Sequence, residues 1–483
     1  MFGALREFSR HLVANGLLPH LFTIAGFLLA FFLVARLMSE KRAPANTLAW
    51  MLIIVLVPYV GVPLYLIFGG RKLRRLAARK TKLLPTLPGS LVGPAPRSVG
   101  PVAHTVIAAG AGPAVGGNKL TLLTTGEEEF AALERHIRQA RHCIHITTFI
   151  LTRDEVGRRI VALLADRARE GIKVRLLLDA LGCPLSSRFF VNPLRRAGGE
   201  VGRFMPVVPL ISPRSANLRN HRKMAVFDHC TVIMGGRNIA LDYMGPTRSR
   251  KRWRDFGAII EGPAAALLNE VFIADWCFTT KQTPDALHAE IPPHVVESRG
   301  TSELQVVASG PDVPGDPLYE GIVAMIQEAE RNIWIVTPYF IPDDVLLRSL
   351  IVKARAGCQV TLIVPARSNH RITDFARRYY TRELRQAGGR VLLYTGEMLH
   401  AKAVIVDDRT ALLGSPNFDL RSLFVNFEIG LLVHSKPEVR AMRAWVEEVI
   451  LRCREPKSDP ASGRRRLLGN VAEDISRLLA PLL

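Results

Sequence analysis

The sequence predicts an α/β protein in which two duplicated halves, each a mixed β-sheet flanked by helices, follow an N-terminal transmembrane helical hairpin. Two long uncharged apolar stretches near the start of the chain predict the hairpin. After them, segments of helical period alternate with short β-rich runs, which is typical of an α/β fold with buried strands. Segments of residues 119–290 then recur in the same order in residues 291–455, and such recurrence indicates an internal duplication.

The hairpin is predicted over residues 1–70, with spans at about 17–38 and 47–70 and a short connection between them. Each span is long enough to cross a bilayer, and buried helices of a soluble domain are the alternative. Basic residues precede the first span and crowd behind the second, whereas the connection has chiefly Lys41 and Arg42. The positive-inside rule therefore puts both ends, and the rest of the chain, on the cytoplasmic side.

Two further segments lack the pattern of a folded half. Residues 71–118 are basic at first and then rich in Pro and Gly without periodicity, so they are predicted to be a linker. Residues 456–483 contain Arg464-Arg465-Arg466 and then apolar residues on one helical face. This tail is predicted to form an amphipathic helix, which either lies on a membrane or packs on the second half.

Composition limits the partners. The formal net charge of +21 implies an acidic partner, either nucleic acid or an anionic membrane, and does not choose between them. The six cysteines have neither paired nor metal-type spacing, which argues against a zinc site and against a disulfide framework. Reduced thiols in a cytosolic compartment are the favoured interpretation.

The duplication is visible at several places outside any motif. Ile137–Val156 corresponds to Ile326–Val345, and both segments place an Asp just before their last residues. Leu194–Gly199 corresponds to Leu384–Gly389, where each ends in Ala-Gly-Gly. Each half is therefore expected to fold as a similar alternation of helices and strands.

One motif occurs once in each half: H-x-K-x4-D, followed at a fixed spacing by G-[GS]-x-N. Its residues are His221, Lys223, Asp228 and Asn238 in the first copy, and His400, Lys402, Asp407, Ser415 and Asn417 in the second. One copy would be weak evidence, but two copies at one spacing are strong. In an extended segment the His and Lys project to the same side, and an apolar strand follows. A second strand then returns to deliver the Gly and the Asn, so each half offers groups suited to an oxyanion, and the predicted oxyanion is phosphate.

With its two motif copies the chain resembles the phospholipase D superfamily. Flanking segments narrow the resemblance to bacterial cardiolipin synthases: Trp253-Arg254-Asp255, Thr337–Phe340, Asn426-Phe427-Glu428 and, nearer the start, Pro58–Gly61. Phe149, Ala180 and His229 depart from the residues usual in that family, which are Tyr, Asp and Gly. The resemblance implies that the two halves face each other across a pseudo-two-fold cleft.

The motif residues have the chemistry to cleave a phosphodiester in two steps. One imidazole attacks phosphorus to give a phosphohistidine, while the other protonates the leaving alkoxide and later deprotonates the acceptor alcohol. Fixed donors meet the charge on the phosphate oxygens, and Lys223, Lys402, Asn238 and Asn417 are the expected set, with Ser415 adding a hydroxyl. No clustered ligands suggest a metal, so neither a metal nor another cofactor is expected.

Roles within this set come partly from the resemblance. It implies that Asp255 and Glu428, which follow the histidines of their own halves, orient the imidazoles. It also favours His221 as nucleophile and His400 as acid and base. Asp228 and Asp407 complete the catalytic motif, and a structural role in the turn is the favoured interpretation for both.

The function that these expectations suggest is a membrane-bound phosphatidyltransferase that makes cardiolipin and glycerol from two phosphatidylglycerol molecules. A hydrolytic phospholipase D is the nearest alternative, and a nucleic-acid phosphodiesterase is a more distant one. The expected location is the bacterial cytoplasmic membrane, as a multi-pass protein with its catalytic part on the cytoplasmic side. The expected partners are phosphatidylglycerol and the anionic membrane, with no nucleic acid, and the oligomeric state stays open.

Overall fold

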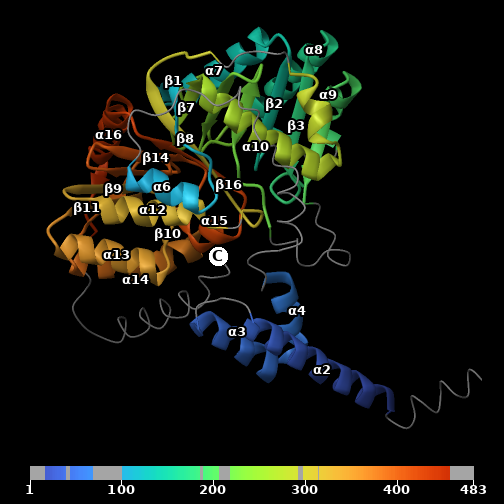
Figure 1. Ribbon diagram of the computed structural model, residues 1–483, viewed down its shortest axis with the longest axis vertical. Coiled ribbons are helices and arrows are strands. Elements are labelled where there is room, and N and C mark those ends of the chain that lie inside the picture. Colours follow the sequence, from blue (N-terminus) through green and yellow to red (C-terminus); the bar gives the residue numbers. More distant parts are fainter. Residues whose placement is uncertain are drawn as a thin grey trace, which may run out of the picture. The chain divides into compact units, whose positions relative to one another are not determined.

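The structure, a computed structural model, describes residues 17–39, 44–68, 100–184, 189–205, 218–291, 297–313 and 315–456 (Figure 1). The N-terminal helices belong to one unit, and the remaining described residues form a second, larger unit. Apart from residue 456, the tail for which an amphipathic helix is predicted lies outside the described residues.

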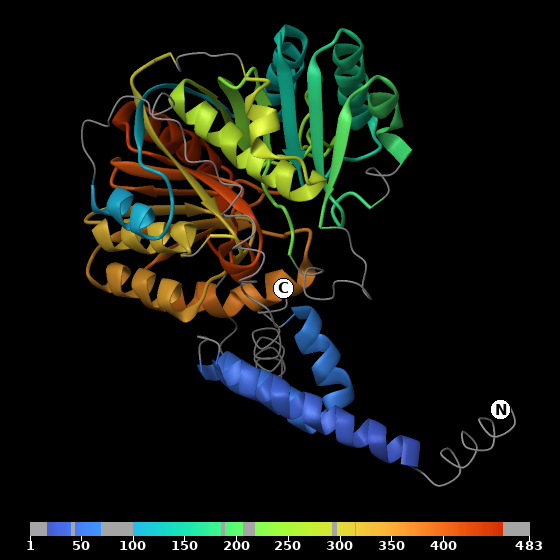
Figure 2. The same ribbon diagram turned by 45° about the vertical axis from the view of Figure 1, so that its right-hand side comes forward.

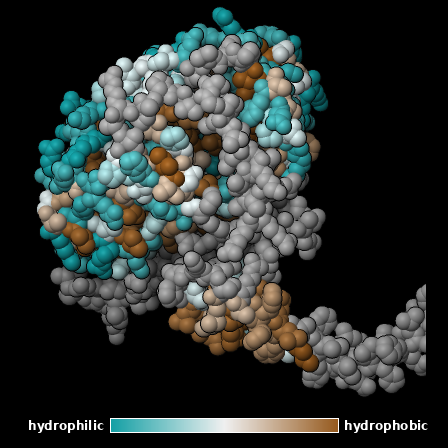
Figure 3. Space-filling view, viewed as in Figure 1, coloured by the Kyte–Doolittle hydropathy of each residue, from teal (hydrophilic) through white to brown (hydrophobic). Residues whose placement is uncertain are grey.

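The N-terminal unit contains α2 (Leu17–Ser39), α3 (Pro44–Leu56) and α4 (Pro58–Phe68). Its helices share a small core that includes Leu33 and Ile54, while many other apolar side chains point outward, so that Phe31 is 75% exposed. The surface of these helices is accordingly hydrophobic (Figure 3). Clustering of apolar side chains on a surface usually marks a contact with lipid or with another protein.

The two predicted spans differ from the observed helices in one respect. The second is not continuous, because helix α3 ends before Val57 and α4 begins at Pro58. Proline lacks an amide hydrogen and disfavours helical geometry in the residue before it, which explains the break. Within the described residues, no helix combines the length and the apolar character needed to cross a membrane. The prediction of a transmembrane hairpin is therefore not confirmed.

The first half of the larger unit alternates strands and helices as predicted. Its elements are β1 (Val115–Leu123), α7 (Gly126–Gln139), β2 (Cys143–Thr148), α8 (Glu155–Arg169), β3 (Lys173–Asp179), α9 (Asn192–Arg196), β4 (Glu200–Phe204), β5 (Met224–Phe227), β6 (Thr231–Gly235), β7 (Gly257–Glu261), α10 (Pro263–Thr280) and α11 (Pro284–His288).

The second half repeats this order with small additions. Its elements are β8 (Ser302–Ser309), α12 (Pro317–Glu328), β9 (Asn332–Val336), β10 (Phe340–Ile341), α13 (Asp344–Arg355), β11 (Gln359–Pro365), α14 (Arg371–Gln386), β12 (Arg390–Tyr394), β13 (Ala403–Val406), β14 (Thr410–Gly414), β15 (Phe418–Asp419), α15 (Leu420–Phe424), β16 (Glu428–Val433), α16 (Lys436–Ile450) and β17 (Cys453–Arg454).

The sheet topology shows the duplication directly. Among the described residues one sheet has 15 strands, and its first-half part runs β1-β7-β6-β5-β2-β3-β4 outward from the junction. The second-half part runs β8-β16-β14-β13-β9-β11-β12 outward from the same junction, with β17 at its edge. Antiparallel pairing of β1 with β8 joins the two parts (Figure 2). The mixed sheet in each half, with parallel β2-β3-β4 and β9-β11-β12, confirms the predicted α/β duplication.

Equivalent helices also begin in equivalent ways. Asp154 caps α8 by accepting a hydrogen bond from the Gly157 amide at 2.9 Å, and Asp343 caps α13 by accepting one from the Leu346 amide at 3.0 Å. Side chains of this kind satisfy amides that the first helical turn leaves without partners. The two aspartates occupy corresponding positions in the duplicated segments, so the repeat extends to the capping chemistry.

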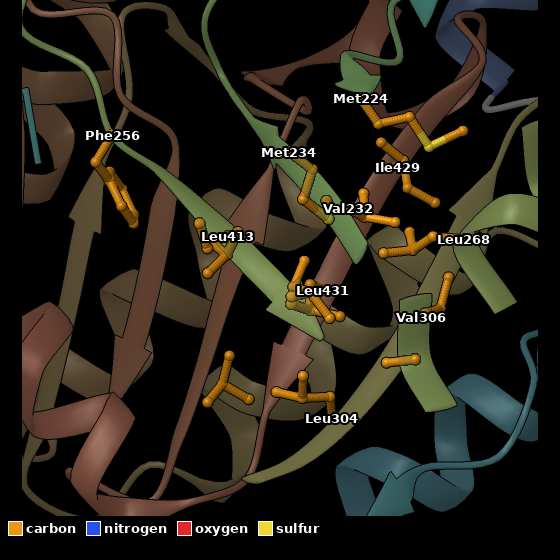
Figure 4. Close-up of a cluster of buried hydrophobic side chains, with 14 of the residues drawn as sticks. Met224, Val232, Met234, Phe256, Leu268, Leu304, Val306, Leu413, Ile429 and Leu431 are labelled. Atoms are coloured by element: carbon orange, nitrogen blue, oxygen red, sulfur yellow. The ribbon is translucent and has the colours of Figure 1, made fainter. Parts of the chain in front are cut away.

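A shared hydrophobic core holds the two halves together. Met234 and Ala258 of the first half belong to the same buried cluster as Leu413 and Leu431 of the second. Figure 4 shows side chains from both halves meeting in this cluster. Separate clusters lie on the outer faces, where helices of each half pack on its own strands. The two halves thus form one folded unit, because their association removes a large apolar surface from water.

The predicted linker is shorter than expected. Residues 101–108 form helix α6 (Pro101–Ala108), whose Val102 and Val106 pack into the core of the second half. Strand β1 begins at Val115, before the predicted start of the first half. The linker prediction is therefore wrong for its last part, because Pro101 suits the first turn of a helix as well as a loop.

Candidate active site

Each motif forms the structure that its spacing predicts. In the second half the strand β13 follows Lys402 directly, turns at Asp407 and pairs antiparallel with β14, which ends at Gly414. In the first half β5 and β6 form the same hairpin, with Asp228 at the turn. Both aspartates have left-handed backbone, with φ near 50°, as tight hairpin turns require.

The residues just before these strands cross to the opposite half. The amide of His221 donates to the Phe427 carbonyl at 2.9 Å, and the amide of Phe427 donates to Arg219 at 2.8 Å. The amide of His400 donates to the Arg254 carbonyl at 2.8 Å. Each histidine is thus fixed against the backbone segment that contains a carboxylate of the other half.

The carboxylates are exchanged between the halves. Nδ1 of His221 lies 2.8 Å from Oε1 of Glu428, and Nδ1 of His400 lies 2.8 Å from Oδ2 of Asp255. Asp255 and Glu428 therefore contact imidazoles as the resemblance implies, but each contacts the histidine of the other half. This pairing corrects the own-half assignment. It also brings both motifs to one site, because each half supplies part of the other's histidine environment.

Aromatic side chains pack on both imidazoles. The ring of Phe149 lies edge to face on His221, with 5.1 Å between centroids, so this departure from the family pattern occupies the site itself. Tyr243 and Trp253 pack on His400 at 5.1 and 5.3 Å. Aromatic side chains packed in this way restrict the orientation of the imidazole rings and exclude water. Exclusion of water strengthens the electrostatic interactions inside the site.

The two lysines lie close to their own histidines in different ways. Nζ of Lys223 donates to the His221 carbonyl at 2.7 Å and lies 5.7 Å from the Phe149 ring centre. Nζ of Lys402 lies 2.7 Å from Nδ1 and 3.1 Å from Nε2 of His400. Both lysines are almost fully buried, so their ammonium groups are shielded from water and suited to donate to a bound phosphate.

Burial determines the protonation of the site. It lowers the pKa of His221 to about 4 and of His400 to about 3, with Lys402 lowering the pKa of His400 further. Burial also lowers the pKa of Lys223 to about 7 and of Lys402 to about 8. Burial opposes ionisation of Asp255, but Lys402 and His400 outweigh it and lower the Asp255 pKa to about 2. Both imidazoles are therefore neutral at neutral pH when no anion is bound.

Glu428 is ionised for similar reasons. Burial raises its pKa, but the neighbouring His221 and Lys223 outweigh burial, so that the pKa falls below its ordinary value. The Ser415 hydroxyl also donates a hydrogen bond to Oε2 of Glu428. Ser415 therefore holds the carboxylate that contacts His221, although the sequence predicted that it would help to bind phosphate.

The other predicted phosphate ligands have mixed surroundings. Oδ1 of Asn238 accepts a hydrogen bond from the Ile150 amide at 3.1 Å. Oδ1 of Asn417 is buried without a hydrogen-bond partner among the described residues. The motif glycines serve strand packing, because a Cβ on Gly414 would lie 2.2 Å from the Ile429 carbonyl oxygen. Glycine at this position therefore allows the close approach of a neighbouring strand.

Asp228 and Asp407 lie at the far ends of their strands and bind backbone. Asp228 accepts hydrogen bonds from the amides of Arg141, His142 and Cys143, and Asp407 accepts them from three consecutive amides beginning at Glu330. The favoured structural interpretation is confirmed, although each carboxylate holds a loop of its own half rather than only its own turn. Neither contacts a histidine of the site, and their inclusion in the catalytic set stays a prediction.

Arg222, between the motif His and Lys, is a residue that sequence reasoning missed. Its guanidinium pairs with Asp275 at 2.7 Å and donates to the carbonyls of Glu428 and Ser309. All of these groups are buried, so Arg222 ties the first motif to two strands of the second half. The only signal in the sequence was a charged residue where the second copy has Ala401.

Three residues with metal-binding side chains meet away from the site. Cys143, His145 and His229 bring their ligand atoms within 4.8 Å of one another. Asn269 contacts Nδ1 of both imidazoles at 2.9 Å, and Arg175 lies 3.3 Å from Nε2 of His145. A cation there would have to displace the arginine and the amide contacts. The expectation of a metal-independent protein stays a prediction.

Comparisons with known proteins agree with this geometry. Residues 133–276 and 322–450 match the family described as "Cardiolipin synthase, PLD-like domain", and residues 27–70 match "Phospholipase_D-nuclease N-terminal". A cardiolipin synthase of Geobacillus kaustophilus is 33% identical over 97% of this chain and 95% of its own length. One of Listeria monocytogenes is 30% identical over 97% of this chain and 100% of its own length.

A solved structure shares the fold. The crystal structure of a phosphatidylserine synthase from Haemophilus influenzae aligns with a TM-score of 0.57 at 17% identity, covering 75% of this chain and 95% of that chain. Because the family match covers both duplicated halves and the relatives align over nearly the whole length, this chain belongs to the cardiolipin synthase family of phospholipase D-like proteins.

Proposed function

We propose that this protein is a cardiolipin synthase, a phosphatidyltransferase that joins two phosphatidylglycerol molecules and releases glycerol. The observation that carries the proposal is the exchange of carboxylates, His221 with Glu428 and His400 with Asp255. It gives one site two imidazoles whose Nδ1 atoms each contact a carboxylate. Nε2 of each ring is then the nitrogen that would meet a substrate, and the ammonium of Lys402, which lies 3.1 Å from Nε2 of His400, would turn to the bound phosphate. Two such groups suit a double displacement at phosphorus.

In the first step Nε2 of His221 uses its lone pair to form a bond to the phosphorus of the donor phosphatidylglycerol. The bond from phosphorus to the glycerol oxygen breaks, and its electron pair leaves with that oxygen. His400, carrying a proton on Nε2, gives it to the oxygen so that neutral glycerol departs. The product on the enzyme is a phosphatidyl group bound to His221.

In the second step a headgroup hydroxyl of another phosphatidylglycerol attacks the same phosphorus. Neutral His400 takes the hydroxyl proton, the bond from phosphorus to His221 breaks, and its electrons return to the imidazole. The new phosphodiester is cardiolipin. Both histidines end in their starting states, so the cycle consumes no other reactant.

The charges around the site support these roles. A neutral imidazole whose Nδ1–H is held by a carboxylate is a competent nucleophile, and burial lowers the His221 pKa to about 4. His400 must be protonated when substrate is bound. The anionic phosphodiester favours that state, because a nearby negative charge raises the pKa of an imidazole. Lys223 and Lys402, with the amides of Asn238 and Asn417, supply the donors for the phosphate oxygens.

The N-terminal helices supply the proposed membrane attachment. Their outward-facing apolar side chains, such as Phe27 and Phe31, would contact lipid, and the proposed orientation keeps the catalytic halves on the cytoplasmic side. The substrates are anionic, and the formal net charge of +21 favours association of the halves with an anionic leaflet. No nucleic-acid partner is proposed.

Lipid analysis tests the proposal. A host that lacks its own cardiolipin synthesis is complemented with this chain or with its His400→Ala variant, and purified full-length chain is given phosphatidylglycerol in vesicles. Cardiolipin with equimolar glycerol from the native chain, and none from the variant, is the expected result. Phosphatidic acid without cardiolipin would instead identify a hydrolytic phospholipase D, and cleavage of DNA in place of lipid would identify a nuclease.

A further inference from the structure

A basic groove lies along helix α14 in the second half (α14 in Figure 1). The cavity has a volume of about 730 Å³, and six of the described residues that line it are arginines: Arg367, Arg371, Arg377, Arg378, Arg382 and Arg385. Asp374 is the single carboxylate among these lining residues, and Arg377 pairs with it at 3.2 Å. The groove therefore carries a large excess of positive charge.

Three of these arginines share one face of the helix. Arg371, Arg378 and Arg385 recur every seven residues on α14, a spacing that places side chains along the same side. All three are exposed. Like charges gathered on one face repel one another, so an anionic ligand would relieve that repulsion.

Apolar side chains stand beside these charges. Ile372 and Phe375 are 54% and 41% exposed, and the Arg378 guanidinium lies 4.6 Å from the Phe375 ring centre. Exposed apolar groups next to arginines match the boundary between lipid headgroups and acyl chains. A soluble anion would make no use of Ile372 or Phe375.

The groove begins close to the candidate active site. His370, the residue before α14, packs on Tyr339 with 5.5 Å between ring centres, and the Tyr339 hydroxyl donates to Asn369 at 2.7 Å. The Thr337 hydroxyl donates to the Tyr339 carbonyl at 2.8 Å and accepts from the amide of Phe418, the residue after Asn417 of the second motif, at 3.2 Å. A short series of contacts thus connects the second motif to the start of the arginine face.

We propose that the α14 groove is a second binding site for the phosphodiester headgroup of an anionic phospholipid, held at the leaflet surface beside the active site. Guanidinium groups bind phosphate oxygens through paired hydrogen bonds, and the neighbouring apolar side chains contact the glycerol and acyl region. The site rests on the proposed function only in taking its ligand from the same membrane. It performs no chemistry itself.

Another occupant would be the tail of this chain, which leaves the groove edge at Pro456. Charge argues against the tail, because residues 457–483 contain five basic and three acidic residues, and a net positive segment does not complement six arginines. Phosphatidylglycerol carries a negative charge on every molecule. The lipid is therefore the better match.

The test uses full-length chain with His400→Ala, so that no turnover occurs, in phosphatidylcholine nanodiscs containing a phosphatidylglycerol with a photoreactive headgroup. After illumination the chain is digested with chymotrypsin, whose sites the arginine variants leave intact, and crosslinked peptides are quantified. The combined variant Arg371→Gln, Arg378→Gln, Arg385→Gln is expected to lose crosslinks in α14 by about tenfold or more. Crosslinks around residues 399–417 should persist.

The matched control is Arg135→Gln, Arg158→Gln, Arg169→Gln, which removes three exposed arginines of the first half and should change nothing. Equal loss in this control would mean that bulk charge alone acts and would overturn the site. Unchanged α14 crosslinks in the groove variant, or competition by inorganic phosphate as effective as by phosphatidylglycerol, would also overturn it.

Glu473→Ala with Asp474→Ala removes two of the tail's acidic residues. If the tail occupied the groove through these two carboxylates, the variant would show more lipid crosslinks in α14, and the increase would disappear when the three arginines are also replaced. That result would make the tail the occupant and overturn the lipid site. Cardiolipin formation by the native chain is measured separately. A negative result for the groove site can therefore be distinguished from a negative result for the proposed function.

Discussion

The two histidines of the site occupy copies of one motif but differ in what surrounds them. His221 contacts Glu428, which Ser415 holds with its hydroxyl. His400 contacts Asp255 and has the ammonium of Lys402 directly against its ring. His221 is also more open, with 12% of its side chain exposed against 6% for His400.

This difference shows how a duplicated motif can divide the work of a reaction. The two copies keep the same hairpin, the same His and the same Lys. Without contacts between the halves, the two histidines would therefore have equivalent surroundings. Exchange of the carboxylates lets each half modify the other's histidine, and small changes nearby then separate their properties. The more exposed His221 suits attack on a bulky lipid phosphate, while the ammonium beside His400 makes its protonated form a stronger acid.

Replacing either histidine should give the largest effect and should separate the two roles. We expect His221→Ala and His400→Ala each to lower turnover by about 10⁴-fold, because residues that act as a unit lose most of the rate together. With phosphatidylglycerol labelled in its phosphate, His400→Ala should retain label on residue 221, detected by peptide mapping after an alkaline quench. Label on residue 400 in the His221→Ala variant would reverse the assignment.

Removing each carboxylate tests the exchange between the halves. Asp255→Asn and Glu428→Gln keep the side-chain shape but remove the charge, and we expect losses of about 10²- to 10³-fold in kcat. Asp255→Asn should behave like loss of His400, so a substrate with an acidic phenol as leaving group should restore much of its rate. Glu428→Gln should show no such rescue. The opposite pattern would mean that each acid serves the histidine of its own half.

Gly236 provides a second route to the same carboxylate. A Cβ at this position would lie 2.5 Å from both carboxylate oxygens of Asp255, so Gly236→Ser must displace that side chain from His400. We expect a loss similar to that of Asp255→Asn, with the same rescue by a better leaving group. A variant that loses activity without this rescue would point to general disruption of the fold, which thermal unfolding would detect.

The buried lysines should make phosphate binding depend on pH near neutrality. Their pKa values are lowered, Lys223 to about 7 and Lys402 to about 8, so their charge is present at low pH and lost as pH rises through these values. Affinity for a phosphonate analogue of phosphatidylglycerol should therefore fall between about pH 7 and 8, by about tenfold for each lysine. Lys223→Met should remove the lower transition and Lys402→Met the higher. Constant affinity up to pH 9 would contradict the burial argument.

The sequence predicted local structure better than it predicted contacts between the halves. The hairpins ending at Asp228 and Asp407, and the order of repeated elements, follow from apolar periodicity and turn residues that are close together in the chain. The exchange that pairs His221 with Glu428 depends on how two separate halves pack, and nothing local in the sequence encodes it.

Other differences had weaker signals. Pro58 was visible as a reason for the helix to break, yet the uncharged run around it looked continuous. Arg222 occupies a variable motif position, and only the structure shows that its partner, Asp275, lies on the buried helix α10. The sequence assigned Ser415 to phosphate because a hydroxyl beside a phosphate motif suits a ligand and a carboxylate equally well, and only the structure shows its contact with Glu428.

Ser415 should give the smallest effect and distinguishes these two interpretations. Ser415→Ala removes one hydrogen bond to Glu428, and the carboxylate keeps its contact with His221. Because one such bond contributes about 1 kcal/mol, we expect kcat to fall about three- to tenfold while affinity for the phosphonate analogue stays the same. If Ser415 instead bound phosphate, as the sequence suggested, analogue affinity would fall and kcat would change less. Measuring both constants on one preparation therefore decides whether this hydroxyl acts through Glu428 or on the substrate.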